Sequence, residues 1–190
     1  KKVKSLISDE YSNANISILS IGKKSSENFK KNGFNIISTH DELFGSLTYE
    51  NVSKVAEVIM KQFVMGDYDK VLLVYNQFKN AATQIIVSEN FLPVHVTKNE
   101  DSKSGDYLFE PKKEEIVEHL IPKSLKTQLF KAILDSHAAE HGARMTAMHK
   151  ATDNAGDLKK ELTLTYNKAR QAAITGEILE IVGGAEALSG

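Results

Sequence analysis

The chain has 190 residues, with 24 Lys and Arg against 25 Asp and Glu, which gives a formal net charge of −1 at pH 7. A charge so close to zero argues against a nucleic-acid-binding protein or one that binds anionic membranes, because both need a strong positive field. The sequence has no cysteine, which excludes disulfides and thiolate metal sites, and no apolar run approaches the roughly 20 residues of a membrane span.

The first hundred residues alternate between strand and helix patterns. Residues 15–22 (NISILSIG) and 34–38 (FNIIS) are short runs rich in β-branched residues, which predict two strands. A short polar helix is predicted between them, over residues 24–32, with Gly33 at its end. This order predicts a strand–helix–strand unit.

A second helix is predicted after Thr48, whose hydroxyl can cap it, and it ends at Gly66. Residues 70–75 (KVLLVY) are a nearly continuous apolar run, as expected of a strand buried on both faces, and residues 83–87 (TQIIV) predict a fourth strand. Strands separated by helices predict an α/β domain over residues 1–111 with a mostly parallel, Rossmann-like sheet. The apolar face of the second helix follows the i, i+3, i+4, i+7 spacing at Val52, Val55, Ala56, Ile59 and Phe63.

The loop after the first strand contains a Gly22–Lys23 pair but lacks the rest of a phosphate-binding loop. Such a loop needs another glycine five positions before this one and Ser or Thr directly after the lysine, where the chain has Ser17 and Lys24. The sequence contains no G-x-G-x-x-G motif. The residues therefore predict a structural sheet without a nucleotide cofactor.

Beyond the α/β domain the chain becomes helical. Residues 96–106 predict a polar surface loop, and a short extended piece (YLFEP) and a helical turn or two follow before Pro122. From Lys123 to about Leu188 there is no proline, and Ala, Leu, Lys and Glu dominate. We therefore predict a helical segment over residues 112–190 with one long C-terminal helix.

Apolar residues recur every three or four positions along this helix, with a mean step close to that of a coiled coil. About 65 helical residues would reach roughly 100 Å, so the helix is expected to protrude from the globular part. A protruding helix with an apolar seam is unstable alone and needs a partner helix, which these residues do not supply. The seam comprises Met145, Met148, Ala151, Ala155, Leu158 and Leu162, extended by Tyr166, Ala169 and Ala173 as far as Glu177.

The same helix contains the spelling H-x-x-E-H, at His137, Glu140 and His141. Zinc peptidases use this motif, because two imidazoles four residues apart share one helix face and the glutamate can act as general base on a zinc-bound water. A peptidase also needs a third protein ligand and the walls of a cleft, which a long exposed helix does not offer. The sequence favours a helix surface without metal, and a zinc peptidase is the alternative.

Residues 143–188 (ARMTAMHKATDNAGDLKKELTLTYNKARQAAITGEILEIVGGAEAL) closely resemble the C-terminal helix of the gamma subunit of F-type ATP synthases. In that family A-R-M-x-A-M, A-T-D-N-A, L-T-L-x-Y-N-K-x-R-Q-A-x-I-T and E-I-x-E-I-V-x-G-A follow in this order and spacing. Upstream, IGKKSSENFKKNGFNI, YDKVLLVYNQF and DYLFEPKKEEIVEHL resemble the family's central α/β domain and its membrane-proximal end. The resemblance covers nearly the whole chain.

The resemblance also implies a partner for the seam. The family begins with a long N-terminal helix that pairs antiparallel with the C-terminal one, followed by a Gly-Leu-Cys-Gly strand, and neither occurs in these residues. The opening KKVKSL has no initiator methionine, apolar core or cleavage site. We therefore interpret the chain as the inside of a longer protein, whose own N-terminal helix forms the other half of the antiparallel coiled coil.

The resemblance implies contacts with the catalytic beta subunit. In the family, the residues matched by Arg170, Gln171 and Thr175 hydrogen-bond to a loop of one beta subunit, as a catch between rotor and stator. A planar guanidinium with five donors beside an amide suits such a contact. Arg144 matches an arginine near an acidic loop of the beta subunit. The bland alternative for the catch residues is a solvated polar helix face.

The resemblance also places contacts at the two ends. Tyr107 and Glu110 match the family's foot, which sits on polar loops of the membrane c-ring, and the alternative for them is an ordinary strand end. The last segment, EILEIVGGAEAL, matches the part that turns inside a sleeve at the top of the alpha–beta hexamer.

The function implied is that of a non-catalytic central-stalk rotor subunit that transmits torque between the proton-driven c-ring and the catalytic alpha–beta hexamer. The implied partners are the alpha and beta subunits, the epsilon or equivalent subunit and the c-ring, without nucleic acid, cofactor, metal or direct membrane insertion. The implied location is a peripheral membrane complex on the cytoplasmic face of a bacterial inner membrane, favoured over the mitochondrial matrix side. A generic coiled-coil adaptor is the alternative that does not involve ATP synthase.

Overall fold

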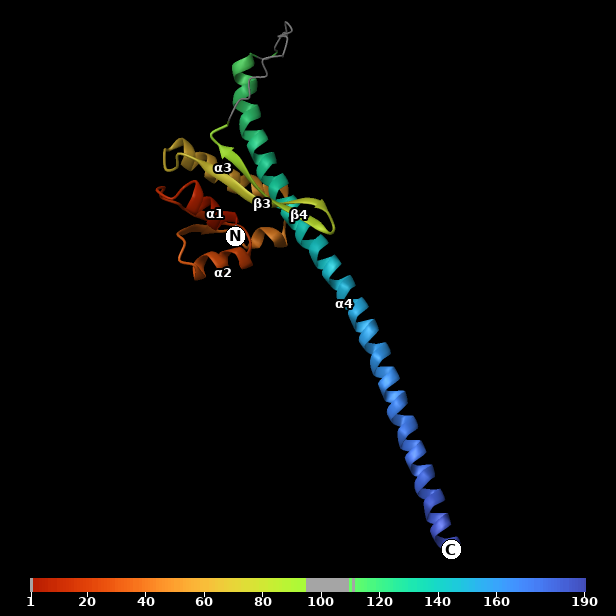
Figure 1. Ribbon diagram of the computed structural model, residues 1–190. Coiled ribbons are helices and arrows are strands. Elements are labelled where there is room, and N and C mark those ends of the chain that lie inside the picture. Colours follow the sequence, from red (N-terminus) through yellow and green to blue (C-terminus); the bar gives the residue numbers. More distant parts are fainter. Residues whose placement is uncertain (1, 95–109, 111) are drawn as a thin grey trace. The chain divides into compact units, whose positions relative to one another are not determined.

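The computed structural model describes residues 2–94, 110 and 112–190 (Figure 1). They divide into two compact units, Lys1–Gly142 and Ala143–Gly190, which are described separately. The expected division at residue 111 stays a prediction. In chain order the elements are α1 (Lys2–Asp9), β1 (Ile18–Ser20), α2 (Lys23–Lys31), β2 (Ile36–Thr39), the 3₁₀ helix η1 (Glu42–Gly45), α3 (Tyr49–Val64), β3 (Val71–Asn80), β4 (Thr83–Leu92) and α4 (Lys113–Ser189).

The predicted strand–helix–strand unit is confirmed. β1 and β2 pair in parallel, with Ile18 opposite Ile36, and α2 connects them. Gly33 follows this helix with φ +73°, a left-handed conformation that glycine adopts without strain because it has no Cβ. The local signals of this segment are therefore sufficient to specify its elements.

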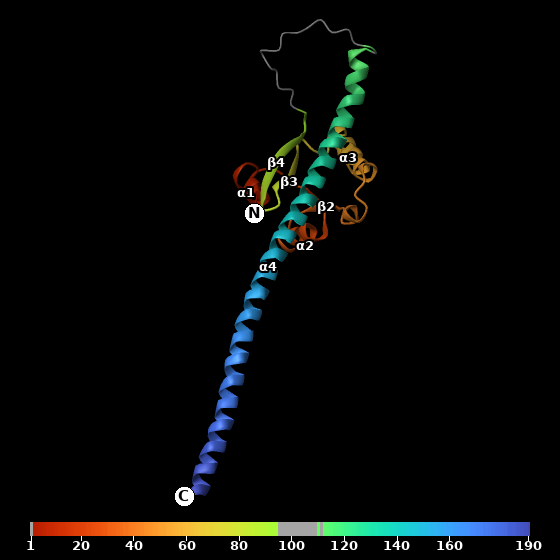
Figure 2. The same ribbon diagram turned by 90° about the vertical axis from the view of Figure 1, so that its right-hand side faces the viewer.

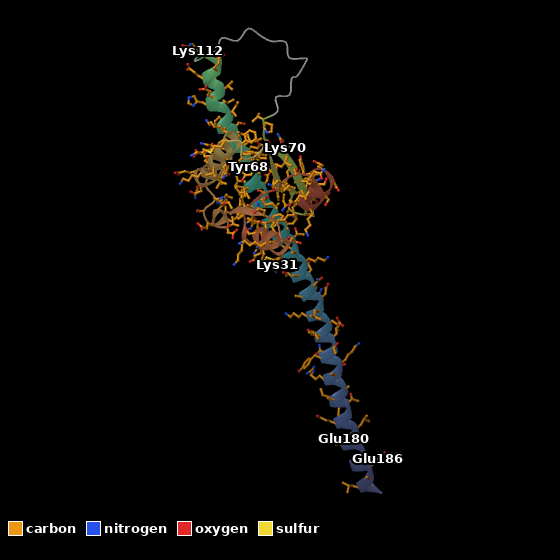
Figure 3. All side chains as sticks on the ribbon, turned by 90° about the vertical axis from the view of Figure 1, so that its left-hand side faces the viewer. Lys31, Tyr68, Lys70, Lys112, Glu180 and Glu186 are labelled. Carbon is orange, nitrogen blue, oxygen red and sulfur yellow. The ribbon has the colours of Figure 1, made fainter. Side chains whose placement is uncertain are left out.

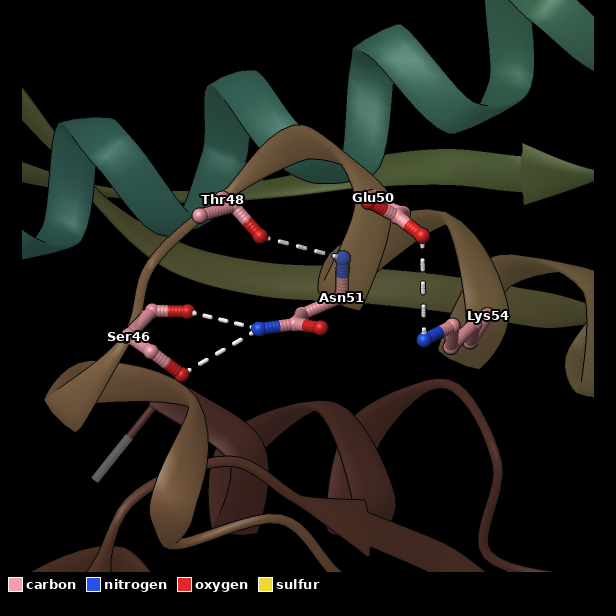
Figure 4. A network of polar contacts seen from close by, with 5 residues as sticks. All are labelled: Ser46, Thr48, Glu50, Asn51 and Lys54. Carbon is pink, nitrogen blue, oxygen red and sulfur yellow. Dashed lines mark hydrogen bonds and ion pairs between the residues drawn. The ribbon is translucent and has the colours of Figure 1, made fainter.

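The start of α3 has the Thr48 cap that the sequence predicts, together with two bonds that it did not predict. The Asn51 N–H donates to Thr48 Oγ1 at 3.3 Å, and Asn51 Nδ2 donates to the Ser46 carbonyl and hydroxyl oxygens at 3.0 and 3.1 Å (Figure 4). Gly66, at φ +83°, follows its end. The predicted apolar face is confirmed, with Val52, Val55, Ala56 and Ile59 buried and Phe63 partly buried against the core.

The second pair of strands differs from the predicted mostly parallel sheet. β3 and β4 form an antiparallel hairpin joined by Ala81 and Ala82. A parallel pair needs a crossover of a dozen or more residues, so a two-residue connection can only turn the chain back on itself. Both strands extend past their predicted ends, and the residues of 70–75 that lie in β3 are half-buried up to Tyr75, which is buried. The α/β fold class with a long C-terminal helix is confirmed, whereas parallel pairing among the described strands is limited to β1 and β2.

The long helix is continuous, as predicted, but it begins before Pro122 instead of after it. Proline has no N–H to donate to the Glu118 carbonyl, and a proline inside a helix usually bends or ends it. Packing of the next turns opposes this tendency. The core of the first unit combines these turns with α3 and the end of β4, and it includes Leu125, Leu129 and Ile133 together with Val52, Phe91 and Leu92.

The β3–β4 hairpin lies beside α4 in the first unit (Figure 1, Figure 2). Gln128 Nε2 donates to the Asn90 carbonyl at 3.3 Å, and the Asn76 N–H donates to Ser136 Oγ at 3.1 Å. These two bonds lie eight residues apart on the helix, so the hairpin follows α4 over more than two turns.

A buried tyrosine strengthens the hairpin from within. The Tyr75 hydroxyl donates to Glu89 Oε1 at 2.7 Å. Burial raises the pKa of Tyr75 to about 12, and the hydrogen bond and negative charge of Glu89, with the charge of Asp135, act in the same direction. The hydroxyl therefore stays protonated and keeps donating at all ordinary pH values.

Candidate functional site

The H-x-x-E-H stretch lies on α4 within the first unit. The His137 and His141 Nε2 atoms are 3.2 Å apart, and the His137 ring stacks on Phe44 of η1 with ring centroids 5.7 Å apart. The half-buried His137 ring is thus part of the packing between η1 and α4. The described residues include no group of three or more His, Cys, Asp or Glu that could hold a metal ion.

We predict that the two histidines bind no zinc at physiological concentration, because a two-imidazole site lacks the third protein ligand of a catalytic zinc centre. Calorimetric titration of the full chain with zinc checks this. A single tight site that disappears in His141→Ala would contradict the prediction and revive the peptidase hypothesis.

The predicted seam residues are exposed along the second unit. Met145, Met148, Leu158 and Leu162 keep between 51% and 63% of their surface exposed. Contiguous apolar surface of this kind marks an interaction site in a soluble protein. Ala155, Leu158 and Leu162 also line one shallow apolar groove, together with Lys159, Thr163 and Tyr166.

The last turns of α4 expose apolar side chains on a second face. At about 100° per residue, the apolar residues from Ile174 to Val182 centre on the side opposite the seam. A helix that is apolar on several sides is normally enclosed by protein. Glu180, within this stretch, and Glu186, after it, project from the helix (Figure 3). The exposed apolar residues of this face are Ile174, Ile178, Leu179, Ile181 and Val182.

The three predicted catch residues are exposed on α4, shortly before and within these turns. Gln171 and Thr175 lie one turn apart and share a face of the helix, and Arg170 is the neighbour of Gln171. Within the described part of the chain, no hydrogen bond or ion pair engages any of the three side chains. Their donors are therefore available to another molecule.

Within the second unit, the predicted beta-subunit contact Arg144 lies far along the helix from the catch. Arg144 is exposed at the start of the second unit, one turn before Met148 and roughly 40 Å along the helix from Arg170. Glu110 is exposed before the start of α4, and Tyr107 lies outside the described residues. The roles of Arg144, Glu110 and Tyr107 stay predictions.

Sequence reasoning missed one contact of α4. Gly142 is buried between the exposed His141 and Ala143, and a Cβ added there would meet Ala81 and Phe78 of the hairpin. The only sequence signal is an isolated glycine inside a helical pattern, which often has a packing reason.

None of the helices in the described ranges is long and apolar enough to cross a membrane.

Comparison with known proteins gives consistent results. A family model described as ATP synthase matches residues 1–188. The ATP synthase gamma chain of Flavobacterium johnsoniae is 60% identical over 183 residues, which are 96% of this chain and 64% of that protein. The ATP synthase gamma chain of Christiangramia forsetii is 57% identical over 190 residues, 100% of this chain and 66% of that protein. The chain thus spans slightly less than two thirds of these two relatives.

Two solved structures share the fold. A chain of the Euglena gracilis mitochondrial ATP synthase, OSCP/F1/c-ring in rotational state 3, matches with a TM-score of 0.64 and 22% identity over 98% of this chain and 66% of that chain. A chain of the Tetrahymena thermophila mitochondrial ATP synthase central stalk and c-ring matches with a TM-score of 0.58 and 23% identity, over 80% of this chain and 66% of that chain.

Proposed function

Because the chain belongs to the ATP synthase family, we propose that it acts as the gamma-type rotor subunit of the central stalk. In this role it transmits torque between a proton-driven c-ring and a catalytic alpha–beta hexamer. It carries out no ATP chemistry itself, which belongs to the beta subunits. A rigid rotor that favours a different state of each catalytic site at each angle couples distant sites in this way.

The observation that carries the proposal is the exposed seam of the second unit, in a chain whose family match extends to residue 188. A single helix with such a seam is stable in water only when another helix covers it. We infer that an antiparallel helix does so, which the resemblance assigns to the gamma chain's own N-terminal segment. Generic coiled-coil pairing would explain the exposed seam, but it would explain only the seam.

The apolar face opposite the seam distinguishes a rotor from a simple coiled coil. The two charged residues between Ile174 and Val182, Glu177 and Glu180, lie toward the seam side at about 100° per residue, so this face itself has no charge that would lock the helix into one register against a surrounding protein. We infer that they turn inside a sleeve of the alpha–beta hexamer. Arg170, Gln171 and Thr175 then form a polar contact with one beta subunit at a time, because the hexamer surrounds a single asymmetric helix.

The remaining contacts follow from the same assignment. Glu110 and Tyr107 belong to the foot on the c-ring, next to an epsilon or equivalent subunit, and Arg144 faces an acidic loop of the beta subunit. The complex then sits as a peripheral assembly on the cytoplasmic face of a bacterial inner membrane.

Co-purification of the full chain with a tagged alpha–beta hexamer tests the proposal. We expect a stable complex with one copy of this chain per hexamer. Ile178→Asp with Val182→Asp should abolish it, because two carboxylates would enter the apolar sleeve at a cost of several kcal/mol. The control, Asn154→Asp with Asn167→Asp, adds the same two negative charges at exposed positions outside these turns and should bind better. If the chain does not bind the hexamer, the result favours the hypothesis of a generic coiled-coil adaptor.

A further inference from the structure

The turn of the β3–β4 hairpin reaches the backbone of α4 at Gly142. A Cβ at this glycine would lie 3.1 Å from Ala81 Cα, 3.2 Å from the Ala81 carbonyl oxygen and 3.2 Å from Phe78 Cε2. Two of these three atoms belong to the backbone and cannot rotate away. The hairpin turn and the helix are therefore as close at this point as the absence of a side chain allows.

On the face of α4 that packs within the first unit, the side chains become smaller toward Gly142. Leu125, Leu129 and Ile133 lie in the core with Phe91 and Leu92 of β4, and smaller residues occupy this side of the helix closer to the hairpin turn. One of these, Ser136, accepts the Asn76 N–H. Decreasing side-chain size lets the backbones of hairpin and helix converge. The residues of the narrowing end are Ala132, Ser136, Ala139 and Gly142.

At Gly142 the cost of a glycine inside a helix coincides with a contact that a side chain would disturb. Glycine in a helix interior is about 1 kcal/mol less favourable than alanine. Gly156 has no atom within 4 Å of an added Cβ, whereas Gly142 is enclosed by the hairpin. Gly142 is also the last buried residue of α4 before the second unit, so it marks the end of the helix's packing within the first unit.

We propose that the contact between the hairpin turn and Gly142 is where turning force passes between the α/β part of the first unit and α4, with Gly142 as its positioning residue. The proposal rests on the rotor function argued above. Side chains at an interface can change rotamer under load, whereas Ala81 and Gly142 have almost no side-chain freedom. A contact between two backbones is therefore stiffer than the apolar packing farther along the hairpin.

The contact between the hairpin turn and Gly142 can be tested first in the full chain alone. Gly142→Leu adds bulk with a good helix former, so α4 should persist while the turn is displaced. We expect amide hydrogen exchange at Ala82 and Thr83 to accelerate at least tenfold, with a smaller effect in Gly142→Ala. The matched control, Gly156→Leu, should leave these amides unchanged. Unchanged amide hydrogen exchange in Gly142→Leu would contradict the proposed contact between the hairpin turn and Gly142.

The mechanical role is tested in the membrane-reconstituted ATP synthase. Gly142→Leu should lower the protons pumped per ATP hydrolysed at least twofold while hydrolysis itself continues, because the helix turns with less force delivered to the first unit. Wild-type coupling in this variant would overturn the proposal. If even the unaltered chain fails to join the alpha–beta hexamer, the rotor function fails instead.

Discussion

Replacing Arg170 and Gln171 together by alanine should lower ATP turnover of the assembled complex at least roughly tenfold and leave the melting of this chain unchanged. Both side chains are exposed on α4 and engage no other described residue, and such substitutions usually change stability by less than about 0.5 kcal/mol. In the complex, each lost hydrogen bond to a charged group costs about 1.5–3 kcal/mol. Turnover and thermal unfolding, measured on the same preparation, separate the two effects.

Two further variants sharpen this experiment. Arg170→Lys should restore only part of the activity, because a point charge cannot reproduce the planar fork of donors. Asn167→Ala with Lys168→Ala removes two neighbouring exposed polar side chains of the same helix and should keep nearly full activity. Full activity in the Arg170 and Gln171 double variant would exclude the catch, whereas a lower melting temperature would make these residues structural.

Leu129→Ala should destabilise the free chain by about 2–5 kcal/mol, whereas Leu162→Ala should change its stability by about 0.5 kcal/mol or less. Both substitutions remove the same atoms from the same helix. Leu129 is 3% exposed in the core of the first unit, and Leu162 is 59% exposed in the second. Only the first substitution leaves a cavity and removes buried apolar contacts.

Urea denaturation of the two variants measures this difference. It is monitored by amide hydrogen exchange or fluorescence of the first unit. Equal effects would mean either that α4 does not pack in the first unit or that the seam is already covered in the free chain. A large effect of Leu129→Ala alone would show that the α/β domain needs residues of α4. The predicted domain boundary at residue 111 would then be too early.

Local signals in the sequence specified much of the molecule. The Thr48 cap, the apolar spacing of α3, and Gly33 and Gly66 act within a few residues, so they could be interpreted without knowing the rest of the fold. The seam of α4 is equally local, because the apolar period of a helix does not depend on its partner. The catch residues came from a long motif resemblance, and the structure adds that they are exposed.

Contacts between distant segments needed the tertiary structure. Ala81 and Ala82 lack the Asn-Gly type of signal that marks a hairpin, so the antiparallel pairing of β3 and β4 was not visible locally. Pro122 stands inside α4 because the next turns are anchored in a core built from α3 and β4. The place of Gly142 depends on a turn far away in the sequence. The sequence by itself determined α2, α3, most of α4 and the exposed seam, because these depend on neighbouring residues. Strand direction, the tolerated proline and the contact of the hairpin turn with Gly142 were decided by packing between segments that only the folded chain brings together.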